Sequence, residues 1–400
     1  MVDGPRKVSP RLAATLVVGA AVLTLGALAI IGCGTSTKKA APHTNVIALD
    51  RLAPRKGRAP THPPTATKPR TAGVSLSRLV GRKLVVRMTG QAPDAQLLDR
   101  VRQGLVGGVI LFQDNVGSLA ELRATTDQLQ AAARAGGEPG LIVAIDQEGG
   151  TVKRLPAGPP NRSPRELGAS GSAAAARSEG RQTGAYLRSL GINVDLAPVL
   201  DVPQSSAAFI APRAFGSSAG PVARLGSAFA TGLADGGVAA TAKHFPGLGS
   251  ATTNTDAGSS VVGASPAALA TQLLPFRRAI SGGIGLVMLS NATYPAYDPQ
   301  TPAGLSRQIV DRLLRGRLGF QGVTITDDLQ APAVTRFLPL AQAAVAGTRA
   351  GDDLLLLARD PGAYQSVFDG LMADARSHRL NMSQLRESYD RVNRLLSGSG

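Results

Sequence analysis

The sequence predicts an α/β fold, a single (β/α)8 barrel of the TIM type, over residues 76–400. Eight short apolar runs rich in β-branched residues recur through this region, and stretches with helical periodicity lie between them. Strands that are apolar at every position are typical of parallel sheets buried on both faces. Strand–helix alternation repeated about eight times then predicts a closed barrel with helices around it.

The helical stretches have recognisable ends. Ser118 and Glu121 form a capping box at the start of the stretch after the second run, and Gly136 ends it. Further helices are expected over 172–190, 221–235, 266–281 and 306–317. The alternative fold is a doubly wound open sheet, which would place a Gly-rich phosphate-binding turn after its first strand, and none follows residues 84–88. The expected strands are LVVRM (84–88), GVILF (108–112), LIVAID (141–146), INVDLAPV (192–199), VAATAKHF (238–245), GLVMLS (285–290), GVTITDD (322–328) and DLLLLA (353–358).

The amino terminus, residues 1–33, has the pattern of a secretory signal. Basic residues precede an apolar stretch over 12–31, which a small residue, Gly32, separates from Cys33, the only cysteine of the chain. This pattern resembles the lipobox of bacterial lipoproteins, in which the cysteine is diacylated and becomes the first residue. The alternative is an uncleaved membrane anchor, since roughly 20 apolar residues can span a bilayer. Both interpretations predict an extracytoplasmic protein held at the outer face of a bacterial cell membrane.

Residues 34–75 are rich in Thr, Pro, Lys and Arg and contain few apolar side chains. Such a segment cannot bury enough apolar surface to offset the entropy that the chain would lose on folding, so a disordered basic linker is predicted. The formal net charge of +16 is concentrated near this end. Residues 1–72 carry eleven of the 43 Lys and Arg side chains but two of the 27 acidic ones. The rest is only mildly basic, without interleaved basic and aromatic residues or zinc-finger spacing, so no nucleic-acid partner is expected.

Polar residues follow the predicted strands at their carboxyl ends, where barrels gather their chemistry. Asp146 ends the third strand, Asp201 follows the fourth, the Lys243–His244 pair ends the fifth, and Asp327 and Asp328 end the seventh. Carboxylates facing cations suit a ligand with many hydroxyl groups. No His pair or carboxylate triplet has metal-ligand spacing, so neither a metal nor an organic cofactor is expected.

Five motifs occur in one order: DQEGGTVKRL (146–155), PRAFG (212–216), KHFPGLG (243–249), YPAYD (294–298) and VTITDDL (323–329). Together they resemble the glycoside hydrolase family 3 β-N-acetylhexosaminidases, single-barrel enzymes that remove N-acetylglucosamine from peptidoglycan fragments. The resemblance implies a retaining mechanism with Asp327 as the nucleophile. It also implies that five residues bind the sugar: Asp146, Arg154, Arg213, Lys243 and His244. Glu148 is expected to be structural.

The loop after KHFPG departs from the family pattern, which places an acid/base histidine and an orienting aspartate there. This chain has Leu248, Asn254, Thr255 and Asp256 at those places. One interpretation makes Asp256 the acid/base, with a pKa raised by Asp327 or by partial desolvation, and Asn254 its supporting residue. A second interpretation is a catalytically impaired glycan-binding lipoprotein. A third is an enzyme for a different β-glycoside, or a phosphorylase that transfers the sugar to phosphate.

Overall fold

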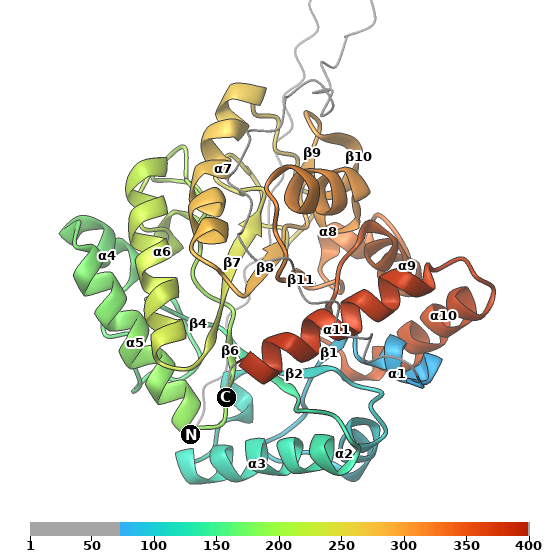
Figure 1. Cartoon of the computed structure of the whole chain (residues 1–400). Coiled ribbons are helices and arrows are strands. Elements are labelled where there is room, and N and C mark those ends of the chain that lie inside the picture. The colour runs from blue at the N-terminus through green and yellow to red at the C-terminus, as the bar shows by residue number, and fades with distance from the viewer. Residues whose placement is uncertain (1–72, 399–400) are drawn as a thin grey trace, which may run out of the picture. The chain divides into compact units, whose positions relative to one another are not determined.

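The computed structural model describes residues 73–398, and all eight predicted apolar runs form strands of one parallel sheet (Figure 1). The strand order is β11-β8-β7-β6-β3-β2-β1-β12. A parallel bridge between Ile325 and Leu354 joins the two outermost strands, so the sheet curls into the predicted barrel. The barrel strands are β1 (Leu84–Arg87), β2 (Gly108–Leu111), β3 (Ile142–Ile145), β6 (Val194–Asp195), β7 (Ala239–Phe245), β8 (Leu286–Leu289), β11 (Val323–Thr326) and β12 (Leu355–Leu357).

Side chains alternate between the inside and the outside of the barrel, as the two-residue period of a strand requires. Val85, Ile110 and Ala144 belong to one interior cluster together with Met288 and Ile325. Their neighbours along the same strands pack instead against the surrounding helices. Because Asp146 and Asp327 lie two residues beyond interior positions, this alternation directs their carboxylates into the mouth of the barrel.

Eleven α-helices are found among the described residues, and five of them begin with a serine whose hydroxyl caps the first turn. The predicted capping box of Ser118 and Glu121 is present, and Gly136 follows the helix it opens. The helices are α1 (Leu76–Gly81), α2 (Ala95–Arg102), α3 (Leu119–Ala135), α4 (Pro164–Ser170), α5 (Ala173–Ser189), α6 (Ala219–Asp235), α7 (Pro266–Ser281), α8 (Pro332–Thr335), α9 (Leu340–Ala350), α10 (Tyr364–Arg376) and α11 (Met382–Gly398).

The stretch 306–317, expected to be an ordinary helix, is instead a π-helix, η5 (Gln308–Arg317). Its buried residues are Ile309, Val310, Leu313 and Leu314, a spacing that an α-helix would satisfy equally well. The hydrophobic pattern therefore located this element and its buried face, but it could not determine the hydrogen-bond register.

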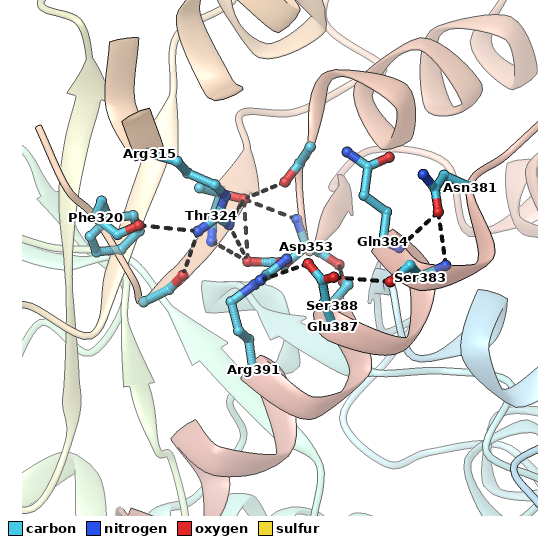
Figure 2. Close-up of polar contacts among 12 residues, drawn as sticks. Arg315, Phe320, Thr324, Asp353, Asn381, Ser383, Gln384, Glu387, Ser388 and Arg391 are labelled. Atoms are coloured by element: carbon cyan, nitrogen blue, oxygen red, sulfur yellow. Dashed lines mark hydrogen bonds and ion pairs between the residues drawn. The ribbon is translucent and has the colours of Figure 1, made fainter. Parts of the chain in front are cut away.

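The carboxy-terminal helix α11 covers the base of the barrel, the end opposite the predicted site. Its residue Val392 is fully buried in the interior cluster, and α11 crosses the strands in Figure 1. Figure 2 shows the polar contacts at this end. The buried carboxylate of Asp353 accepts from Arg315 at 2.6 Å, from Arg391 of α11 at 2.9 Å and from the backbone N–H of Thr324 at 3.0 Å. Polar and apolar contacts together fix α11 to the first residues of β11 and β12.

Two short hairpins extend from the carboxyl ends of strands. β4 (Gln147–Gly149) pairs with β5 (Val152–Lys153) directly after β3, and β9 (Thr293–Tyr294) pairs with β10 (Asp298–Pro302) after β8. Between residues 73 and 398, no helix is both long and apolar enough to cross a bilayer. The predicted signal or anchor, Cys33 and the linker up to residue 72 lie outside the described residues.

Candidate active site

A cavity of about 320 Å³ opens at the carboxyl ends of the barrel strands. Two of its walls come from β7 and from the residues after β11, and a third from the loop between β7 and α7. It brings together every predicted site residue that the structure describes: Asp146, Arg154, Arg213, Lys243, His244, Asn254, Asp256 and Asp327. Residues separated by up to 181 positions in the sequence therefore contribute to one concave site, as the barrel topology predicts.

Lys243 lies at the centre of a buried ionic network on one side of the cavity. Its Nζ contacts Asp146 Oδ1 at 2.7 Å and Glu148 Oε1 at 2.6 Å. Glu148 also accepts two hydrogen bonds from Arg213, at 2.8 Å from Nε and 2.6 Å from Nη2. Burial alone would raise the pKa of Glu148, but Lys243 and Arg213 lower it to about 2. Glu148 is thus ionised and holds both cations, which agrees with its expected structural role.

Arg154 contacts the carboxylate of Asp146 and an aromatic ring. Its Nη2 lies 3.5 Å from Asp146 Oδ2, and its guanidinium lies 5.1 Å from the ring centre of Phe112. The guanidinium of Arg87 lies 4.5 Å from the same ring and is paired with Asp114. Phe112 therefore contributes an aromatic face between two cations to the wall of the cavity.

His244 is fixed by a fully buried aspartate. Asp201 Oδ2 lies 2.7 Å from His244 Nδ1, while Asp201 Oδ1 accepts from the backbone N–H of Leu248 at 2.6 Å. Since Nδ1 is engaged with a carboxylate, Nε2 is the ring atom that remains for a ligand in the cavity. Asp201 also anchors the start of the β7–α7 loop through its contact with Leu248.

Asp327 directly follows β11 and is held by the backbone. Its N–H donates to Leu289 O at 3.0 Å, and its Oδ1 accepts from the N–H of Asp328 at 2.8 Å. Burial raises the pKa of Asp327. The neighbouring His244 lowers this pKa, and the neighbouring Asp256 raises it further. A carboxylate held this rigidly at the floor of a cavity can attack a bound electrophile.

Asp256 lies on the β7–α7 loop with its side chain 60% exposed. Its Oδ1 accepts from Arg359 Nη2 at 2.7 Å. Asn254 contacts the backbone instead, because its Oδ1 accepts from the N–H of Asp256 at 3.0 Å. Asn254 therefore shapes the turn that carries Asp256, and Arg359 holds the carboxylate itself.

Sequence reasoning missed Arg87, Phe112 and Arg359 as residues of the site. All three stand at or next to the carboxyl ends of strands, in the runs LVVRM and GVILF and directly after DLLLLA. Applying the strand-end rule to every strand, rather than to the motif-bearing ones alone, would have found them. Between residues 73 and 398, no three His, Cys, Asp or Glu side chains converge to hold a metal ion.

Comparison with known proteins agrees with this geometry. The model of the glycosyl hydrolase family 3 N-terminal domain matches residues 79–395. An uncharacterised secreted glycosyl hydrolase of Arthroderma benhamiae is 37% identical over 335 residues, covering 81% of this chain and 94% of that protein. A beta-hexosaminidase of Methylobacillus flagellatus is 34% identical over 294 residues, covering 70% of this chain and 81% of that protein.

A solved structure gives the same result. The family 3 β-N-acetylglucosaminidase of a Paenibacillus species superposes with a TM-score of 0.79 at 33% identity, over 82% of this chain. The chain spans 63% of that enzyme's length. The family model and the solved structure point to glycosyl hydrolase family 3, and the two relatives are named as glycosyl hydrolase and beta-hexosaminidase. This is the family that the five sequence motifs resemble. The chain therefore belongs to glycosyl hydrolase family 3 and is a glycosidase.

Proposed function

We propose that this glycosidase is a retaining β-N-acetylhexosaminidase, which removes β-linked N-acetylglucosamine-type sugars from cell-wall glycan fragments. The observation that carries the proposal is the position of Asp327 in a cavity lined by Asp146, Lys243, His244 and four arginines. The cavity of about 320 Å³ is near the lower end of ligand pockets, which run from roughly 300 to 1,000 Å³. This size suits a single terminal sugar.

Each group has a role in this mechanism. Four charged residues, Lys243, Arg154, Arg213 and Asp146, bind the sugar hydroxyl groups through charge-assisted hydrogen bonds, and His244 binds the sugar through Nε2. Ionised Asp327 attacks the anomeric carbon, the bond from that carbon to the leaving-group oxygen breaks, and a glycosyl ester on Asp327 forms. The leaving-group oxygen takes its proton from Asp256. Asp256 then removes a proton from water, which attacks the ester and releases the sugar and free Asp327.

One observation favours a second candidate function. The carboxylate of Asp256 is engaged by Arg359 at 2.7 Å, whereas a general acid must be free to donate a proton to the leaving group. A protein with this pairing could bind the sugar without turnover, or could transfer the sugar to phosphate. Phosphate, as an acceptor that is already anionic, needs no deprotonation by a general base.

The test is turnover of aryl β-N-acetylglucosaminides by the purified protein, with and without inorganic phosphate. Release of the free sugar supports the hydrolase, and release of a sugar phosphate supports the phosphorylase. Calorimetric binding of N-acetylglucosamine without turnover in either condition supports the binding protein and overturns the hydrolase.

We also propose that the protein is a lipoprotein attached through Cys33, outside the cytoplasm. The signal-like amino terminus supports this, and the similar Arthroderma benhamiae protein is named as secreted. The intact mass of the membrane-extracted protein tests it. A mass that corresponds to a diacylated chain starting at Cys33 is expected, and a mass that includes residues 1–32 would establish the uncleaved anchor instead.

A further inference from the structure

Arg359, directly after β12, links two parts of the active site. Its Nε contacts Asp328 Oδ2 at 2.7 Å, and its Nη2 contacts Asp256 Oδ1 at 2.7 Å. The residue lines the cavity together with both carboxylates. One guanidinium therefore spans from the ends of β11 and β12 to the loop between β7 and α7.

The two ends of this link differ in rigidity. The side chain of Asp328 is 8% exposed, and its Oδ1 accepts from the N–H groups of Gln330 and Ala358 at 3.0 Å each. The side chain of Asp256, in contrast, is 60% exposed. Apart from the contact with Arg359, the loop next to Asp256 is held by a backbone hydrogen bond, which Ala333 N donates to Thr255 O at 3.3 Å. Arg359 thus fastens an exposed loop to a fixed point of the barrel.

The charges around Arg359 are mostly negative. Asp328 faces it from the end of β11 and Asp256 faces it from the loop. Asp327 lies near both of these carboxylates and near His244 of β7, which is paired with Asp201. Arg336, after α8, lies beside Gly258 of the same loop. The guanidinium lies between the carboxylates of Asp256 and Asp328, and Asp327 lies nearby. If the guanidinium were removed, these three carboxyl groups would repel one another strongly.

We propose that Arg359 is a positioning residue of this glycosidase, which clamps Asp256 over the cavity through their direct ion pair. The proposal rests on the proposed function, because it assigns Arg359 to the acid/base and nucleophile of that mechanism. On substrate binding, the leaving-group oxygen competes with Arg359 for Asp256, while Arg359 stays attached to Asp328.

The test compares Arg359→Gln and Arg359→Lys with the wild-type protein in full pH profiles of kcat and kcat/KM on an aryl β-N-acetylglucosaminide. In a retaining glycosidase the acidic limb reports the nucleophile and the basic limb the acid/base. The guanidinium contacts Asp256 directly, so its removal changes the surroundings of the acid/base. The basic limb of Arg359→Gln is therefore expected to move to higher pH, while the acidic limb stays in place. Arg359→Lys should restore most of the wild-type profile.

Arg349→Gln provides the matched control. Arg349 is 48% exposed, pairs with Asp374 at 2.7 Å and is not among the residues that line the cavity, so its loss should move neither limb. A second readout is amide hydrogen exchange over residues 249–258, which should become faster in Arg359→Gln and stay unchanged in Arg349→Gln.

The outcomes separate this inference from the proposed function. A lower kcat at every pH with both limbs in place, or unchanged exchange in the loop, would overturn the positioning role of Arg359. Absence of turnover in the wild-type protein would overturn the hydrolase and leave the exchange measurement to decide whether Arg359 holds the loop.

Discussion

A Glu148→Gln substitution keeps the shape of a buried side chain but removes the charge that holds Lys243 and Arg213. Glu148 is 2% exposed, so solvent does not screen these contacts. A pKa displaced from 4.5 to about 2 corresponds to roughly 3 kcal/mol of stability, and breaking a buried ion pair costs about the same. The free energy of unfolding at pH 7 should therefore fall by about 3 kcal/mol.

The assay is thermal unfolding followed by circular dichroism at several pH values. At pH 7 the melting temperature of the variant is expected to be lower by roughly 5 °C. Because the folded pKa of Glu148 lies below its unfolded value, its contribution is complete above about pH 4.5 and is lost as the pH falls toward 2. The difference between variant and wild type should shrink in that window.

Glu387→Gln is the matched control. Glu387 is 59% exposed and lies 3.8 Å from Arg391, so its loss should change the unfolding free energy by less than about 0.5 kcal/mol. If Glu148→Gln unfolds within about 1 °C of the wild type at pH 7, the stabilising role of the buried network is refuted. A difference that stays constant from pH 7 to pH 2 would show that the lost charge is not its cause.

Three further substitutions have defined outcomes. Asp327→Ala should reduce turnover of an aryl β-N-acetylglucosaminide by about 10⁴-fold or more while sugar binding measured by calorimetry persists, and residual activity near the wild-type level would exclude Asp327 as nucleophile. Asp256→Asn should slow substrates with poor leaving groups far more than activated aryl glycosides, since only the former need a strong proton donor; equal losses on both would argue against an acid/base role. Asp352→Asn should raise the melting temperature at pH 7, because Asp352 is 1% exposed and neither carboxyl oxygen has a hydrogen-bond partner. Burial raises the pKa of Asp352 well above its ordinary value, so the carboxyl destabilises the fold above about pH 4 and the gain should vanish below that pH; a lower melting temperature at pH 7 would contradict this account.

The barrel could be predicted because its strands are short, apolar and evenly separated, and because parallel strands have few other ways to be buried. Asp146, Lys243 and Asp327 could be placed from the strand-end rule alone. Arg154 and Arg213 needed the family motifs, since an arginine in a loop has no periodicity that marks it. The π-helix over 308–317 was not predictable, because its apolar spacing fits an α-helix as well.

Arg359 stands at a strand end, but its contact with Asp256 could not be found by sequence reasoning. It stands in the stretch ARDP, which reads as a charged surface turn, and its partner Asp256 lies 103 residues away. Only closure of the barrel, which places β12 beside β11, brings the two within hydrogen-bond distance. The side-chain contact that orients the Asp256 carboxylate was expected from Asn254, but Arg359, which lies after the last of the five motifs, makes it instead.

The helix at the base of the barrel has a consequence for access. Tyr389 and Asn393 of α11 line a surface hollow together with Gly73 and Val74, so the start of the described chain lies at that base. The cavity opens at the opposite end, where the strands finish. The described chain therefore begins at the end of the barrel opposite the cavity mouth, so a group joined at Gly73 starts away from the site.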